Sequence, residues 1–204
     1  MKLYYTPGSC STASHIALEE AGVPFEIVRV NMKDKTAPDG SSYLTVNPKG
    51  YVPALVLDNG DVYTENTALL AWIGGLNPKS GLVPPAGTTA NFRMHEWLGY
   101  LATEVHKTVS PLFRPTTPEA TIAAQRELLA RRLAYTEQQL AGKQYLTGDS
   151  FTVADCYLFI ILSWFGRLNV DIAPYPNLKA YQARIAARPK VIKAMQDEGL
   201  LKAA

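Results

Sequence analysis

The residue that most clearly indicates chemistry is Cys10, which stands where a strand should end and a helix should begin. Residues 3–5 favour a short strand, Pro7 and Gly8 interrupt it, and helical spacing starts at Ser11. A thiol at a helix N-terminus lies among unpaired N–H groups, which favour the nucleophilic thiolate. The same donors can instead hold the thiolate of a bound small molecule. Cys10 can also be a small buried hydrophobe, and Ser11 can donate to sulfur or only cap the helix.

A second motif, Val52-Pro53, precedes a predicted strand. A cis bond would turn the Val52 backbone outward beside Cys10, where its N–H and C=O would pair with an extended peptide. If the bond is trans, Pro53 has only a structural role, as a proline that opens an edge strand. The sequence does not decide between the two isomers.

A third motif opens a predicted helix at Thr64-Glu65-Asn66-Thr67. Backbone N–H groups at such a start favour a carboxylate, and Glu65 beside them can take an ammonium. Together they suit the amino-acid end of a zwitterionic ligand. The alternative is that Glu65 only stabilises its own helix.

A stripe of small or polar residues, Gly99, Thr103, His106 and Ser110, recurs at helical spacing in the second half of the chain. It can face solvent, or it can border a cleft in which His106 donates a proton or orients a ligand. No His, Cys and carboxylate cluster has metal-ligand spacing, so we expect no metal.

The bulk properties are those of a globular protein. The 204 residues are 47% apolar and 19% charged, with a net charge of +2. Lys and Arg are scattered, so we expect no nucleic-acid partner, and no apolar run is long enough to cross a bilayer. The chain opens with charged and turn residues rather than a signal peptide, and two cysteines are no disulfide framework. We therefore expect a cytoplasmic protein with reduced thiols.

Strand signals are confined to the first 80 residues. After the first strand and helix we expect a strand over 26–30 and a hairpin over 54–63, with a type I′ turn at Asn59-Gly60. A helix over 65–74, capped by Thr64, should follow. The first two strands should be parallel because a helix joins them, and the hairpin should be antiparallel.

A linker over 77–85 leads to residues 86–204, which read as helical throughout. One long helix should stop before Pro111, and Thr117 should cap the next. Thr152 and Asp155 resemble a capping box that opens a buried central helix, and two shorter helices should cover 178–187 and 189–197. The expected fold class is a small α/β domain at 1–78 followed by an all-α domain at 86–204.

Taken in order, these motifs resemble cytosolic glutathione transferases, and most closely the bacterial beta class. The resemblance covers nearly the whole chain and rests on residues 4–11, 46–65 and 147–155. Each stretch alone is a weak signal, and their order and spacing together are specific. It implies a thioredoxin-like N-terminal domain that binds glutathione, and a helical-bundle C-terminal domain that forms the pocket for the electrophile. It also implies a homodimer and a cis Val52-Pro53 bond.

The resemblance assigns roles residue by residue. Cys10 and Ser11 would lie near the glutathione sulfur, and His106 would approach it from the helical domain. Val52, next to Pro53, would pair with the cysteinyl backbone. The ends of the tripeptide would be held by the side chains of Glu65, Asn66 and Lys35, the last at the glycyl carboxylate.

The same resemblance implies a second, apolar substrate site lined by Phe113, Trp164 and Leu168. Thr103, Lys107 and Gly99 match positions that can reach the partner subunit's site. Two residues depart from the family pattern: Asn66 replaces a small residue, and Gly99 stands where relatives offer an Asn side chain.

Three functional hypotheses follow. The main one is a cytoplasmic detoxifying transferase, which conjugates the glutathione thiol to small apolar electrophiles. The second is a monothiol disulfide reductase or peroxidase, in which Cys10 forms a mixed disulfide with glutathione. The third is a non-enzymatic protein of the same fold that binds apolar ligands or a partner protein.

Overall fold

The structure of this protein is a computed structural model, which describes residues 1–202. The chain forms two packing units. Unit 1 holds Met1–Val83 and the described residues from Ala187 onward, and unit 2 holds Pro84–Ala186. These units reflect packing alone, so the domain boundaries at 1–78 and 86–204 remain a prediction.

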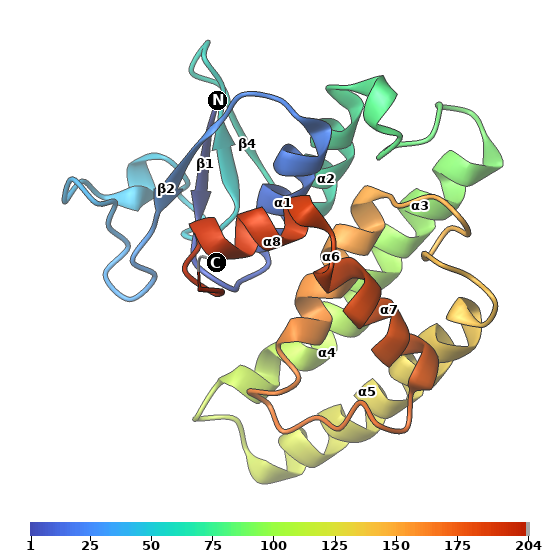
Figure 1. The fold of residues 1–204 in the computed structure, drawn as a ribbon. Coiled ribbons are helices and arrows are strands. Elements are labelled where there is room, and N and C mark those ends of the chain that lie inside the picture. The colour runs from blue at the N-terminus through green and yellow to red at the C-terminus, as the bar shows by residue number, and fades with distance from the viewer. Residues whose placement is uncertain (203–204) are drawn as a thin grey trace. The chain divides into compact units, whose positions relative to one another are not determined.

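Unit 1 contains a mixed four-stranded sheet with the strand order β2-β1-β3-β4 (Figure 1). The strands are β1 (Lys2–Tyr5), β2 (Glu26–Arg29), β3 (Ala54–Val56) and β4 (Val62–Thr64). β1 and β2 are parallel, whereas β3 is antiparallel to both β1 and β4. The pairing expected from the helix-linked strands and from the hairpin is therefore confirmed.

Side chains of β1 alternate between the two faces of the sheet, as a strand requires. Leu3 and Tyr5 are buried toward one face. Tyr4 packs toward the other, where its ring centroid lies 5.6 Å from that of Tyr43. Tyr43 belongs to a short helix, η1 (Tyr43–Thr45), within the long connection between β2 and β3.

The helices of unit 1 are α1 (Ser11–Ala21), α2 (Asn66–Gly75), the short η2 (Pro78–Ser80) and α8 (Pro189–Asp197). α1 packs against both α2 and α8, so the last helix of the chain returns to the first (Figure 1). α1 ends at Gly22, whose φ of 67° is the left-handed conformation that glycine adopts without strain. Leu69, Leu70 and Ile73 of α2 are buried, as expected.

Two local predictions in unit 1 are wrong. The hairpin turn is not type I′, because Gly60 has a positive φ of 89° and Asn59 does not. Hydrogen bonds from Gly60 N–H to Leu57 O and from Leu57 N–H to Asp61 O define a three-residue loop that ends in a left-handed glycine. Thr64 does not cap α2, since the residue at the N-cap is Glu65.

Unit 2 is helical. It comprises α3 (Thr89–Tyr100), a π-helical segment η3 (Leu101–His106), α4 (Lys107–Val109), η4 (Ser110–Phe113), α5 (Glu119–Leu140), α6 (Val153–Ser163) and α7 (Pro176–Ala186). The long helix stops before Pro111, as predicted, because α4 ends at Val109 and Pro111 lies in the separate 3₁₀ turn η4. π-helical turns are rare and occur often at functional sites, and this one ends at His106.

α6 is the buried centre of unit 2, as the uninterrupted apolar run predicted. Its capping box is confirmed: Asp155 accepts hydrogen bonds from the Thr152 N–H at 2.8 Å and the Thr152 hydroxyl at 3.0 Å. The Leu146 N–H and the Tyr181 hydroxyl also donate to this carboxylate. Thr117, by contrast, does not cap α5, and its hydroxyl donates to Pro111 O instead.

We predict that Asp155→Ala lowers the free energy of unfolding by about 3 kcal/mol, because it leaves several buried donors without an acceptor. Chemical denaturation followed by circular dichroism measures this change. Thr117→Ala is the matched control, with an expected loss below about 1 kcal/mol. Equal losses in the two variants would contradict the prediction.

Candidate active site

The turn from β1 to α1 places Cys10 at the N-cap of α1, where the sequence predicted it. The turn is held by short hydrogen bonds among its own residues. Thr6 N–H donates to the Ser11 hydroxyl at 3.1 Å, and that hydroxyl lies 2.7 Å from the Ser9 hydroxyl. Because Ser11 is fully buried and engaged in this way, its hydroxyl shapes the turn.

The Cys10 thiol donates to the backbone carbonyl of Val52, with Sγ 3.4 Å from the oxygen. Burial raises the pKa of this thiol to about 11, although the N–H groups of Cys10 and Ser11 oppose the shift. The nearby Glu65 carboxylate raises the pKa further. The expectation of a thiolate at Cys10 is therefore wrong, because desolvation outweighs the effect of the helix N-terminus. At neutral pH the side chain is a hydrogen-bond donor.

The segment that faces Cys10 is anchored through the residue before Val52. The Tyr43 hydroxyl and the Asn47 amide each donate to Tyr51 O at 2.7 Å. The Val52-Pro53 peptide bond is cis, as the family resemblance implied. Within residues 1–202, no hydrogen bond uses the Val52 N–H. The Val52 backbone thus presents an unpartnered donor beside the cysteine.

The first backbone N–H groups of α2 also lack a side chain that caps them. Glu65 has φ 70° and ψ 111°, and its side chain makes no capping hydrogen bond to the helix. Its carboxylate pairs instead with the Lys49 ammonium. Asn66 accepts from the Ser14 hydroxyl of α1 at 2.8 Å, while its buried Nδ2 has no partner among the described residues. The first N–H groups of α2 are therefore open to an anion.

Lys35 lies in the connection between β2 and β3 and has a left-handed backbone, with φ 55°. Its ammonium donates to Gly50 O at 2.9 Å, which ties this cation to the segment that leads into Val52. Unit 1 therefore brings together Cys10, Val52, Glu65 and Asn66, with Lys35 tethered to the same segment.

Unit 2 holds its own cluster of predicted residues, around an aromatic patch. The His106 ring centroid lies 4.9 Å from that of Trp164, and the Phe113 centroid lies 5.7 Å from Trp164. His106 Nδ1 lies 2.7 Å from the Tyr157 hydroxyl. Leu168 is buried nearby in sequence, after α6.

Burial lowers the pKa of His106 to about 4, and the neighbouring Lys107 lowers it further. The imidazole is neutral at pH 7. Sequence reasoning missed Tyr157 because it lies within the apolar run of α6, where nothing in the local pattern links it to a histidine 51 residues earlier.

Gly99, Thr103 and Lys107 are exposed along α3, η3 and α4. The Thr103 hydroxyl donates to Gly99 O at 3.1 Å, so it is partly used within the helix. A Cβ atom at position 99 would meet nothing within 4 Å. This stripe is therefore open in the single chain.

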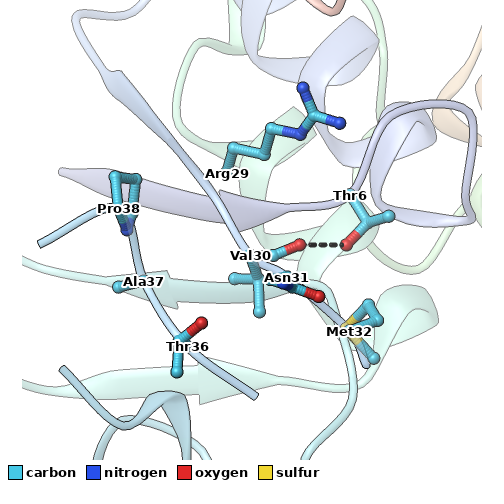
Figure 2. A pocket seen from close by; sticks show the side chains of 8 residues that line it. All are labelled: Thr6, Arg29, Val30, Asn31, Met32, Thr36, Ala37 and Pro38. Atoms are coloured by element: carbon cyan, nitrogen blue, oxygen red, sulfur yellow. Dashed lines mark hydrogen bonds between the residues drawn. The ribbon is translucent and has the colours of Figure 1, made fainter. Parts of the chain in front are cut away.

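A separate cavity of about 550 Å³ opens along β2 and the loop after it (Figure 2). Thr6, Arg29 and Met32 lie on its wall, and the Thr6 hydroxyl donates to Val30 O at 3.0 Å. None of the predicted site residues lines this cavity. It therefore adds no group to the candidate site.

The comparisons with known proteins agree with this geometry. The profile of the glutathione S-transferase N-terminal domain matches residues 8–76, and that of the C-terminal domain matches residues 100–189. Glutathione S-transferase GstA of Escherichia coli O157:H7 is 40% identical over 200 residues, which cover 98% of this chain and 100% of that protein. The chain therefore belongs to the glutathione S-transferase family.

Solved structures place it more narrowly. A sphingomonad glutathione S-transferase complexed with glutathione is 44% identical with a TM-score of 0.94. A bacterial beta-class enzyme from Sphingomonas chungbukensis is 41% identical with a TM-score of 0.95. Each alignment covers 98% of this chain and 100% of the other. The fold class and the resemblance expected from sequence are thus confirmed.

No helix within residues 1–202 combines the length and the apolar character that crossing a bilayer needs.

We predict that alkylation of Cys10 by iodoacetamide accelerates about tenfold per pH unit from pH 7 to 10, because the thiolate fraction rises with a pKa of about 11. Mass spectrometry of the modified peptide measures the rate. Cys156, which is fully buried, is the internal control and should stay unmodified. A rate that levels off near pH 7 would contradict the raised pKa.

The neutral His106 predicts a pH dependence of stability. The unfolded imidazole titrates near pH 6.5 and the folded one near 4, so unfolding takes up a proton between these values. The free energy of unfolding should therefore fall as pH falls from 6.5 to 4. His106→Gln should remove part of this fall in urea titrations, whereas His95→Gln, at an exposed position, should leave it unchanged.

Proposed function

We propose that this protein is a glutathione transferase that conjugates the thiol of glutathione to small apolar electrophiles. One observation carries the proposal: unit 1 gathers a thiol donor at Cys10, the unpartnered Val52 N–H and the unsatisfied start of α2. These three features match a sulfur, an extended peptide backbone and an α-carboxylate. Glutathione carries all three in one molecule.

The chemical step is a nucleophilic substitution. The glutathione sulfur attacks an electrophilic carbon, a C–S bond forms, the leaving group departs with its electron pair, and the thiol proton passes to solvent. The site must therefore stabilise the thiolate of glutathione. The protonated Cys10 thiol is a donor for that negative charge, and the N–H groups of Cys10 and Ser11, which act on the Cys10 sulfur, add positive potential beside it. A downward shift of one pKa unit corresponds to about 1.4 kcal/mol, which a few hydrogen bonds to a charged sulfur can provide.

The rest of the tripeptide would be held by complementary groups. Val52 pairs with the cysteinyl backbone as a neighbouring strand would. Glu65 takes the ammonium of the γ-glutamyl end, while the N–H groups of α2 and the Asn66 amide face its carboxylate. Lys35 takes the glycyl carboxylate. The sphingomonad relative with bound glutathione supports this ligand.

The second substrate would lie against Phe113 and Trp164 of the aromatic patch in unit 2, with Leu168 as a further apolar residue of its pocket. His106 is neutral, so it acts there as a hydrogen-bonding and orienting group rather than as a cation. We further propose a cytoplasmic homodimer with a detoxifying role. In it, Gly99, Thr103 and Lys107 lie toward the partner subunit.

Replacing Glu65 tests the ligand directly. Glu65→Gln should raise the dissociation constant of glutathione by about tenfold, because a charged partner of the ammonium is lost. Calorimetry measures binding, and conjugation of an activated chlorinated aromatic at neutral pH measures turnover. Glu26→Gln, an exposed carboxylate on β2, is the matched control and should bind normally. Failure of the unmodified protein to conjugate above the background rate would reject the proposal.

A variant of the cysteine separates conjugation from disulfide exchange. Cys10→Ser keeps a donor, so conjugation should fall by less than about tenfold. A monothiol reductase route would instead lose all activity, because a hydroxyl cannot form the mixed disulfide. Full loss of both reactions would favour the covalent route over the proposed one.

A further inference from the structure

A buried histidine of unit 1, His15, lies outside the proposed glutathione site. It is fully buried on α1, and its ring is fixed between two aromatic neighbours. The centroid of Tyr5 lies 6.1 Å away, and Phe25 packs edge-on with its centroid at 5.5 Å. The orientation of the imidazole is therefore set by packing.

The acceptor for one ring nitrogen is equally fixed. Nδ1 lies 3.0 Å from Oε1 of Glu198, a residue that is itself buried. The other oxygen of this carboxylate accepts from the Thr12 hydroxyl at 2.7 Å and from Gly8 N–H at 3.0 Å. Because the Glu198 carboxylate accepts these bonds, we assign the ring hydrogen to Nδ1, and Nε2 is then the nitrogen that can offer a lone pair.

The second ring nitrogen has no hydrogen-bond partner within residues 1–202. His15 Nε2 is buried and unpartnered, and it lies 3.8 Å from Oδ2 of Asp197 at the end of α8. Glu19, one turn further along α1, brings a second carboxylate. One ligand atom from each of the three residues lies within 4.8 Å of the others. An unused lone pair thus points toward two carboxylates.

This arrangement resembles a metal site with its supporting residue in place. A metal-binding histidine usually donates its other N–H to a carboxylate, which fixes the tautomer, and Glu198 fills that position. One imidazole and two carboxylates suit a divalent ion of the Zn²⁺ type. We propose that His15, Glu19 and Asp197 bind such an ion, with water as the fourth ligand.

Closing the site needs a modest rearrangement. Ligand atoms around tetrahedral zinc lie about 3.3 Å apart, so the carboxylates must move inward by about 1 Å. The Lys193 ammonium now pairs with both of them, at 2.8 Å from Glu19 and in an ion pair with Asp197. Lys193 is half exposed and can turn toward solvent when a metal ion arrives. The bound ion would then join α1 to α8.

The sequence predicts no metal, because the spacing of these three residues along the chain does not indicate a shared site. His15 and Glu19 stand four residues apart on one helix, which is a common spacing without a third ligand. Asp197 comes from the other end of the chain. Only the return of α8 to α1 brings it beside them.

Zinc titration of the untagged, metal-stripped full chain tests the proposal. We expect one Zn²⁺ per chain by calorimetry, and a rise in melting temperature with zinc concentration because only the folded chain has the site. Asp197→Asn should weaken binding at least tenfold. Lys193→Met should strengthen it, because the ammonium that pairs with both carboxylates is gone and only Lys190, 3.6 Å from Glu19, still competes. Glu26→Gln is the matched control and should bind as the unmodified chain does.

A spectroscopic measurement on the unmodified chain tests the same site without any substitution. Long-range ¹H–¹⁵N spectra of the imidazoles should show the His15 Nε2 resonance shifting at one equivalent of zinc, while exposed His95 stays unchanged. The proposal is overturned if no saturable binding occurs below about 1 mM zinc. It is equally overturned if Asp197→Asn and Glu26→Gln bind alike, or if His15 Nε2 does not move.

Discussion

The buried carboxylate of Glu198 is the interaction on which unit 1 most depends. It accepts from Gly8 N–H in the β1–α1 turn, from the Thr12 hydroxyl on α1, and from the His15 ring. A buried charge is costly unless hydrogen bonds satisfy it, and here three donors do so. Because these donors lie on both sides of Cys10 in sequence, the residue that ends α8 helps to set the geometry of the turn that holds Cys10.

The chemistry of the site follows from a competition between burial and hydrogen bonding. At Cys10, burial prevails, so the thiol stays protonated even at a helix N-terminus. Burial likewise keeps His106 neutral. A site built this way offers neutral donors to an anion rather than a charged nucleophile of its own. That property favours a substrate that brings its own sulfur, as glutathione does.

The fold also leaves certain backbone groups without partners where a ligand would supply them. Buried polar groups are nearly always satisfied, so the open Val52 N–H, the uncapped start of α2 and the Asn66 Nδ2 are informative exceptions. All three lie in unit 1, close to Cys10. His15 Nε2 is a further exception, on the same helix as Cys10 and beside a different set of side chains. Unsatisfied atoms therefore mark both places where we propose that unit 1 binds a ligand.

The sequence by itself established the features that depend on residues close together along the chain. The strand before Cys10, the buried α6 and its capping box follow from apolar spacing and turn residues within a few positions, so they were predicted correctly. The type I′ turn and the Thr64 and Thr117 caps failed, because the left-handed glycine alone shaped the loop and a neighbouring residue took each N-cap position. Tertiary structure alone decided the Cys10 pKa, the Tyr157 partner of His106 and the position of Asp197 beside His15. Desolvation and contacts between distant segments arise only when the chain has folded, and no local pattern encodes them.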